Sequence, residues 1–444
     1  MRFVTRGALT SVLISTLIAV PACVPPRPLV ITAPPAVEAV HPDKRRAPHP
    51  AVQFYNTFWD ALADVNVQAA WIAAESREQR TLADAIEDFL DGRNHEADST
   101  LTTILGANDS AVRKAARITY GALLTSQGAW RQLANFADSA TRETRDAAGV
   151  EAWAPAFKNV STNITFADTA FSLPLTHSVT GVAIIPVTVN GVKLHFWLDT
   201  GTSITILSSS VADAANVTGL GKDTLELVGA VGRVSTQAAV VKTVKIGGVT
   251  IANAPAMVVS DLALQIREVN TGMPPVPVDG VIGFDVIREL DLTINDIDGV
   301  VVIRKPTVRP ADDRNPRNLS WFGVPIVTLL SDNGTPIHLL LDTGAEETFG
   351  TPGLAAKSHA HWRAAERRTI QGFGGRKIET GVVIPSVRLF LGDVPLVFKR
   401  IFLYRVDYPT IFKLDGTLGA EVARGQIMRI DMTNGHLDIY GRPQ

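Results

Sequence analysis

The chain has 444 residues, of which 46% are hydrophobic and 19% charged, so it can bury several cores and wholesale disorder is excluded. Lys and Arg total 42 against 44 Asp and Glu, for a net charge of -2, so we expect no nucleic-acid partner, because no basic excess neutralises phosphates. The single cysteine excludes a disulfide framework and a multi-thiolate metal site, and we expect no metal and no cofactor.

The first residues have the pattern of an export signal. Arg2 and Arg6 precede an uncharged, largely apolar run of 13 residues, Ala8 to Val20. This run is too short for a permanent membrane span but fits the apolar segment of a secretory signal. Val20-Pro-Ala-Cys23 resembles the lipobox of bacterial lipoproteins, although its proline departs from the usual residue. We expect a signal peptide over residues 1–22 and a lipid on Cys23 that anchors the protein at the periplasmic face of the envelope, on the outer membrane. An ordinary signal-peptidase site also fits and would leave Cys23 a free thiol.

A tether and a helical domain follow. Residues 23–50 contain eight prolines, which predicts an extended spacer. Residues 51–160 are predicted to be helical, because apolar residues such as Leu82, Ile86 and Phe89 share one helix face. We expect its tryptophans, including Trp71 and Trp130, to pack between antiparallel helices. This domain is a candidate surface for a protein partner, and a tetratricopeptide-like groove is the alternative, although no 34-residue period is present.

After residue 160 the sequence changes to short apolar runs separated by Gly, Asn and Asp, which is typical of strands. It also repeats itself. Residues 190–201 align with residues 333–344 at an offset of 143, with seven identities in twelve positions. The same offset superposes residues 229–233 on 372–376, and an offset of 136 superposes 279–283 on 415–419. We predict two copies of one β-rich unit, at residues 161–305 and 318–444, joined by a linker at residues 306–317.

Each copy carries Asp-Thr-Gly directly after an apolar strand, at Asp199 and Asp342. Glycine lets a second backbone approach closely, and threonine can fix the turn by a local hydrogen bond. If a pseudo-twofold axis relates the copies, the two carboxylates lie about 3 Å apart and share one proton. One then acts as general base on a water while the other polarises a carbonyl. We therefore predict that Asp199 and Asp342 are catalytic and that four residues support their loops: Thr200, Gly201, Thr343 and Gly344.

These motifs resemble the units of retropepsin-like aspartic proteases, the group that includes retroviral proteases and related bacterial domains. The resemblance covers both copies and rests on Asp-Thr-Gly, a glycine-rich flap hairpin and an apolar-apolar-Gly motif. It implies a multi-domain protein in which an N-terminal α-helical segment precedes two mainly-β acid-protease units arranged as a pseudo-twofold pair, with a protein or peptide as substrate. It also implies flap or substrate-binding roles for Gly229, Gly232, Gly372, Phe373, Gly375 and Glu346.

The two copies differ in ways that predict an asymmetric cleft. Thr417 replaces the usual apolar residue of the second apolar-apolar-Gly motif, and Glu421 stands where the first copy has Asp285. Glu346 and its neighbour Glu347 replace an acidic pair that contacts substrate backbone in the retroviral pattern. A salt bridge of these glutamates with Arg367 or Arg376 is an equally open interpretation.

We expect an aspartic endopeptidase of the bacterial cell envelope, acting as a monomer with one site between its two copies, because a short linker gives a high effective concentration. Two alternatives stay open. One is a homodimer with separate half-sites, and the other is a non-catalytic peptide-binding or assembly lipoprotein that keeps the fold. His195 and His338 precede the two aspartates at equivalent positions, and we expect them to be strand residues rather than catalytic ones.

Overall fold

The computed structural model describes residues 38–39, 47–139, 152–221, 225–229, 231–266, 276–310, 315–373 and 375–441. The predicted signal peptide and the lipidation site Cys23 lie outside these residues. Within them, no helix is both long enough and apolar enough to cross a membrane. Two residues of the predicted tether form strand β1 (Glu38–Ala39), which pairs antiparallel with β23 (Val394–Leu403).

An N-terminal helical region precedes mainly-β sheets, as predicted. Side chains cap four of its described helices; for example, Ser76 accepts from the Gln79 amide and Asp109 from the Val112 amide. The predicted apolar face is buried, but Trp71 is 46% exposed under the Arg80 guanidinium, so its expected place in the core is wrong. The helices are α1 (Phe58–Ala63), α2 (Val67–Ala73), α3 (Arg77–Leu90), α4 (Asn94–Ile104), α5 (Ser110–Ser126), α6 (Trp130–Ser139) and α8 (Ala154–Phe157).

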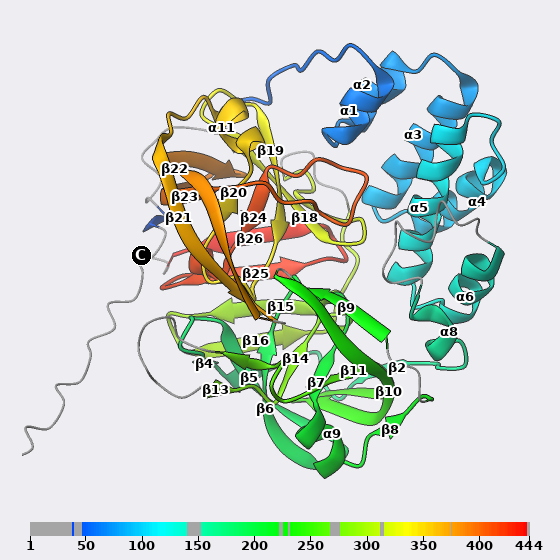
Figure 1. Ribbon diagram of the computed structural model, residues 1–444, viewed down its shortest axis with the longest axis vertical. Helices are drawn as coiled ribbons and strands as arrows, with labels where there is room; N and C mark the ends of the chain where they lie inside the picture. Colours follow the sequence, from blue (N-terminus) through cyan, green and yellow to red (C-terminus); the bar gives the residue numbers. More distant parts are fainter. Residues whose placement is uncertain are drawn as a thin grey trace, which may run out of the picture. The chain divides into compact units, whose positions relative to one another are not determined.

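The first repeat forms a ten-stranded sheet (Figure 1). Strand β5 alternates buried and half-buried residues, and Asn190-Gly191, both at positive φ, turn it into β6. Its strands are β2 (Asn163–Phe166), β4 (Thr176–His177), β5 (Ala183–Val189), β6 (Val192–Leu198), β7 (Ile206–Ser208), β8 (Thr218–Gly219), β9 (Leu225–Gly229), β10 (Gly232–Ile246), β11 (Val249–Val259) and β14 (Gly280–Ile282). Helix α9 (Ser209–Ala214) lies between β7 and β8 in the chain, α10 (Phe284–Ile287) follows β14, and β12 (Gln265–Ile266) pairs with β13 (Val276–Pro277).

The second repeat has its own nine-stranded sheet with the same central pairing. Strand β24 lies parallel to β19 and antiparallel to β20, as β14 does to β6 and β7. Besides β1 and β23, its elements are β17 (Leu319–Trp321), β18 (Pro325–Ser331), β19 (Pro336–Leu341), β20 (Phe349–Gly350), α11 (Pro352–Ser358), β21 (Arg363–Gly372), β22 (Gly375–Leu391), β24 (Gly416–Leu418) and the 3-10 helix η1 (Ala420–Ala423).

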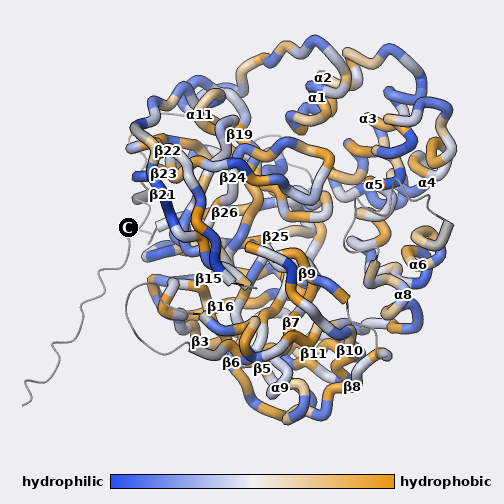
Figure 2. The backbone as a smooth tube through the Cα atoms, viewed as in Figure 1, coloured by the Kyte–Doolittle hydropathy of each residue, from blue (hydrophilic) through white to orange (hydrophobic). Residues whose placement is uncertain are grey.

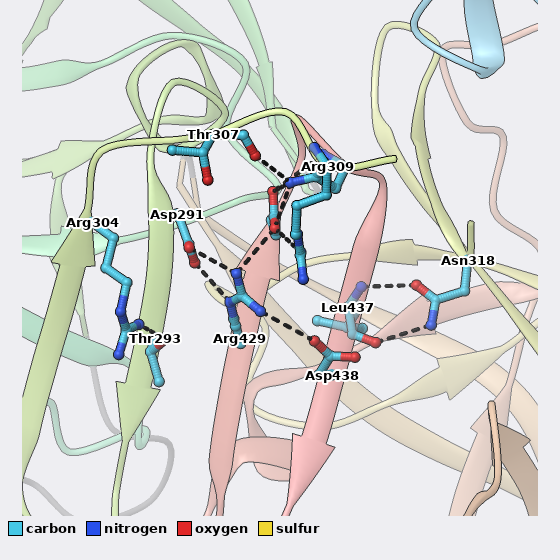
Figure 3. A network of polar contacts seen from close by, with 11 residues as sticks. Asp291, Thr293, Arg304, Thr307, Arg309, Asn318, Arg429, Leu437 and Asp438 are labelled. Atoms are coloured by element: carbon cyan, nitrogen blue, oxygen red, sulfur yellow. Dashed lines mark hydrogen bonds and ion pairs between the residues drawn. The ribbon is translucent and has the colours of Figure 1, made fainter. Parts of the chain in front are cut away.

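A five-stranded sheet joins the two repeats. Its order is β26-β25-β15-β16-β3, and β15 of the first repeat pairs antiparallel with β25 of the second, with Thr293 opposite Arg429. Arg429 donates two 2.8 Å hydrogen bonds to Asp291 and one of 3.1 Å to Asp431 (Figure 3). The strands are β3 (Ala170–Pro174), β15 (Asp291–Asn295), β16 (Val300–Arg304), β25 (Ile427–Asp431) and β26 (His436–Tyr440).

The helical segment contacts both repeats. On the second repeat, the Phe89 ring lies 5.6 Å from the Phe322 ring. On the first, the Trp153 indole donates a 3.2 Å hydrogen bond to the Glu226 carbonyl of β9. The helical segment therefore packs on both repeats.

Candidate active site

The central strands of each repeat deliver an aspartate to the same place. Asp199 follows β6, and its amide donates a 3.1 Å hydrogen bond to the carbonyl of Ile282 in β14. Asp342 follows β19, and its amide donates a 3.0 Å bond to Leu418 in β24. The predicted apolar-apolar-Gly motifs are thus the strands against which the Asp-Thr-Gly loops are held.

The two loops are joined through their threonines. The Thr200 amide donates a 3.0 Å hydrogen bond to the Thr343 hydroxyl, and the Thr343 amide donates one of 3.0 Å to the Thr200 hydroxyl. Each hydroxyl then donates across the interface, Thr200 to the Leu341 carbonyl at 2.7 Å and Thr343 to the Leu198 carbonyl at 2.8 Å. All four bonds cross from one repeat to the other, so the loops are held in one arrangement.

Each carboxyl group packs on the glycine of the opposite loop. A Cβ on Gly201 would lie 2.5 Å from Cγ of Asp342, and a Cβ on Gly344 would lie 2.4 Å from Cγ of Asp199. Only glycine leaves this space. Each glycine amide also donates to the carboxylate of its own loop, at 2.8 Å from Gly201 to Asp199 and at 2.9 Å from Gly344 to Asp342.

The electrostatics of the two carboxyls follow from this contact. Burial raises the pKa of Asp199, while hydrogen bonds from Thr202, Asp342 and the loop amides work in the opposite direction. The pKa of Asp342 is raised well above its usual range, first by burial, then by the negative charge of Asp199 and by the hydrogen bond between the two groups. The pair therefore binds a proton more tightly than two separate carboxylates would.

The two aspartates differ in one contact that the sequence analysis missed. The Thr202 hydroxyl donates a 2.7 Å hydrogen bond to Asp199, whereas Ala345 stands at the corresponding place and offers Asp342 only its amide, at 3.0 Å. The added donor favours the ionised form of Asp199. The residue that follows Asp-Thr-Gly in each repeat was the available sign of this difference.

A buried acid supports each loop from behind. In the first repeat, the Thr205 hydroxyl donates to Asp285 at 3.1 Å, and burial raises the pKa of Asp285 to about 6. In the second repeat, Glu421 accepts a 2.6 Å bond from the Thr348 amide, and burial raises its pKa to about 7. Glu421 thus supports the same loop position as Asp285, despite its extra methylene.

Both glycine-rich hairpins form, and their tips meet. Gly229 pairs with Gly232 across one turn and Gly372 with Gly375 across the other. A Cβ on Gly229 would lie 2.7 Å from the carbonyl oxygen of Phe373, so the tip of the second hairpin touches the first.

The structure gives a partner for one residue of the acidic pair. Glu347 lies 3.4 Å from Arg368, which is neither of the two arginines predicted to pair with it, and Glu346 is exposed. Thr417, the residue that departs from the apolar pattern, shares a 3.1 Å hydrogen bond with the Tyr408 hydroxyl.

His195 and His338 lie in the strands, away from the carboxyl pair. The backbone amide of His195 donates to Asp279 at 3.0 Å, and that of His338 donates to Asp415 at 2.9 Å. Burial lowers the pKa of His338 to about 3. In the described part of the chain, no three His, Cys, Asp or Glu side chains are grouped so that they could hold a metal ion.

The family comparison falls on this site. Residues 185–286 match the aspartyl protease family. The match contains Asp199, the first flap hairpin and Gly283, so the predicted retropepsin-like fold is confirmed, and the match indicates a protease. Among solved structures, the chain is similar to a retropepsin-like aspartic protease from Rickettsia conorii, with 16% identity and a TM-score of 0.20, over 33% of this chain and 94% of that chain. No curated protein matches the chain.

Proposed function

We propose that the protein is an aspartic endopeptidase in which Asp199 and Asp342 form one catalytic dyad. The observation that carries this proposal is the reciprocal packing of each carboxyl on the glycine of the opposite loop. Two acids in hydrogen-bond contact cannot both ionise readily, so they hold one proton between them near neutral pH.

The asymmetric hydrogen bonds favour a division of labour. Asp199, which Thr202 stabilises as a carboxylate, takes a proton from a water whose oxygen attacks the peptide carbonyl carbon, while Asp342 donates its proton to the carbonyl oxygen. The resulting diol collapses when its hydroxyl proton returns to Asp342 and Asp199 protonates the amide nitrogen. The carbon–nitrogen bond then breaks, releasing a carboxylic acid and an amine and restoring the dyad.

The proposal includes a pseudo-twofold pairing of the repeats within one chain. The exchanged threonine bonds support it. So does the register of β15 and β25, in which Asp291 lies opposite Asp431 and Asn295 opposite Ile427. Asp291 and Ile427 are equivalent positions of the two repeats, 136 residues apart, and so are Asn295 and Asp431. A twofold axis through the Thr293–Arg429 pair would therefore exchange these two pairs.

We also propose an envelope location, with the chain exported and anchored through a lipid on Cys23. The first residues of the sequence support this. Fractionation of cells that produce the full chain, with mass spectrometry of the mature N-terminus, tests it. A diacylated Cys23 in the outer-membrane fraction is expected, and an unprocessed Met1 in the cytoplasm contradicts it.

The enzymatic proposal is tested with the full chain, purified in detergent, and β-casein as an unfolded protein substrate over a range of pH. Asp199→Asn and Asp342→Asn should each abolish cleavage, because an amide can neither accept the proton of the attacking water nor donate one to the peptide carbonyl. Asp213→Asn and Asp332→Asn, at exposed positions of the first and second repeats, are the matched controls and should retain it. If the native chain cleaves nothing, or if both active-site variants remain active, the proposal fails.

A further inference from the structure

The sheets of the two repeats have the same strand order, position for position. The first reads β2-β11-β7-β14-β6-β5-β10 and the second reads β1-β23-β20-β24-β19-β18-β22. Strand β1 therefore stands in the second sheet where β2 stands in the first (Figure 1). The two strands differ in origin, because β2 belongs to its own repeat whereas β1 belongs to the predicted tether, before the helical segment.

The registers of these two pairings are also equivalent. Ile251 of β11 lies opposite Ile164 of β2, and Leu396 of β23 lies opposite Ala39 of β1. Ile251 and Leu396 are each the third residue of their strand. Further along, the parallel pairings of β11 with β7 and of β23 with β20 both begin at the ninth residue. Two residues of the tether thus take the place, in the same register, of a strand that belongs to the fold.

The edge that β1 covers is apolar. The first five residues of β23 are Val-Pro-Leu-Val-Phe, without a charge, and Leu396 is fully buried. At the opposite edge of the sheet, β21 belongs to a hairpin that Figure 2 shows as largely hydrophilic, with three arginines and one glutamate among its first six residues. Charged side chains protect a sheet edge from pairing with another chain. The β23 edge has no such protection at Leu396 and needs a partner strand.

The sequence of the tether suits it to this place. A strand that adds to a sheet edge donates backbone amides, which proline lacks. Residues 36–41 are the longest stretch without proline in the tether, and β1 lies within them. The linker that precedes the second repeat is engaged elsewhere, since the Arg309 amide donates a 2.8 Å hydrogen bond to Asn434 in the turn between β25 and β26.

We propose that the edge of β23 at Leu396 and Val397 is a strand-addition site, and that its occupant is the chain's own tether, through Glu38 and Ala39. Main-chain pairing at a sheet edge is a general way of capturing an extended segment. The tether is then a docked part of the second repeat rather than only a spacer. This site depends neither on the proposed catalysis nor on the proposed lipid.

Docking shortens the free part of the tether. The Ala51 amide donates a 2.8 Å hydrogen bond to the Gly334 carbonyl, so the chain is also held at that point. The 15 residues from Cys23 to Glu38 span at most about 50 Å, whereas the 28 residues from Cys23 to Ala51 span at most about 95 Å. Docking therefore keeps the second repeat within about 50 Å of the membrane, a consequence that rests on the proposed lipid at Cys23.

Disulfide trapping tests the site in the full chain with Cys23→Ser, so that the introduced thiols are the only ones. Glu38→Cys with Val397→Cys places two cysteines directly opposite each other, at the Cα separation of about 5 Å that a disulfide can bridge. The matched control is Glu38→Cys with Lys399→Cys, two residues further along, where the diagonal separation of about 7–8 Å is too long.

After mild oxidation, the opposite pair should be linked within one chain at least about fivefold more than the diagonal pair. Mass spectrometry of the linked tryptic peptides identifies the bond, and thermal unfolding verifies that each variant is folded. Equal linkage of the two pairs would overturn the site. Linkage between two chains would show that a second copy supplies the strand and would overturn the proposed occupant.

Two prolines should release the tether. Glu38→Pro with Ala39→Pro removes both amides, one of which faces β23 because successive amides of a strand point to opposite sides. Hydrogen exchange in residues 394–398 should then accelerate by about fivefold or more. The matched control, Ile31→Pro with Thr32→Pro, lies elsewhere in the tether and should leave the exchange unchanged. Unchanged exchange in the first variant would contradict the docking.

Energy transfer tests the reach. The lipidated chain is bound to vesicles of phosphatidylethanolamine and phosphatidylglycerol, with a donor dye on Ser386→Cys, an exposed position of the second repeat, and an acceptor on the lipid. The Glu38→Pro, Ala39→Pro variant should show weaker transfer than the native tether, and the control should match the native tether. Equal transfer would show that docking does not set the reach. A chain that carries no lipid refutes the anchor and the reach together, while the disulfide result decides the strand-addition site by itself.

Discussion

Thr200 and Thr343 exchange two hydrogen bonds of 3.0 Å although 143 residues separate them. Their hydroxyls also bond to the strands that deliver the opposite aspartate. These contacts couple the geometry of the two carboxyls to the junction of the repeats, so damage at the threonines should reduce both stability and activity.

We predict that Thr200→Val destabilises the protein by about 2 kcal/mol, because the buried Thr343 amide and Leu341 carbonyl both lose their partner. Urea unfolding measures this. Thr200→Ser keeps the hydroxyl and should recover most of the loss. Equal stability of the valine variant and the native chain would show that the exchanged bonds do not hold the repeats.

Thr202→Val should change the pH dependence of catalysis. The Thr202 hydroxyl stabilises the carboxylate of Asp199, so its loss raises the lower apparent pKa of the dyad. The acidic limb of the kcat/KM profile should move upward by about half a unit to one unit, the size expected for one lost charge-assisted hydrogen bond. An unchanged limb with a lower kcat contradicts the assignment of Asp199 as the ionised partner.

Glu421→Gln should alter how stability depends on pH. The pKa of Glu421 is raised from 4.5 to about 7 by burial, so the folded protein keeps a proton that the unfolded chain loses. Its contribution to stability is complete below pH 4.5 and is lost as the pH rises to 7.

The free energy of unfolding of the native chain, relative to Glu421→Gln, should therefore fall by roughly 3 kcal/mol across that window. Comparing the two proteins cancels the other buried groups. Asp285 has a slope of the same sign up to about pH 6, and His338 one of opposite sign from about pH 3 to 6.5. A difference that does not vary with pH would contradict the raised pKa.

Arg429→Ala should destabilise the junction of the repeats by about 3 kcal/mol, because it leaves the buried carboxylate of Asp291 without its cation, whereas Asp431 keeps its ion pair with Arg309. The matched control is Arg388→Ala, which breaks the exposed 3.6 Å ion pair with Asp332 and should cost less than about 1 kcal/mol. Guanidinium unfolding compares the two, and equal losses would contradict the role of Arg429.

Much of the fold followed from the sequence, because both repeats keep the same strand and turn pattern. The offset of 143 identified both Asp-Thr-Gly loops and both hairpins, and the helix faces followed from their apolar spacing. Contacts made only in the folded chain could not be predicted. The hydrogen bond from the Thr348 amide to Glu421 could not be predicted, because Glu421 has a longer side chain than Asp285, its counterpart in the first repeat. The hydrogen bond from Trp153 to β9 could not be predicted either, because no sequence pattern relates the helical segment to that strand.

We propose that one chain contains one complete dyad, and an assay of the two active-site variants mixed together tests this. Asp199→Asn and Asp342→Asn are assayed on β-casein separately and after refolding together at equal concentration. We predict no cleavage in any of the three samples, because every chain then carries a broken dyad. Recovery of activity in the mixture, or activity in either variant alone, would show that sites form between chains and would contradict a dyad within one chain.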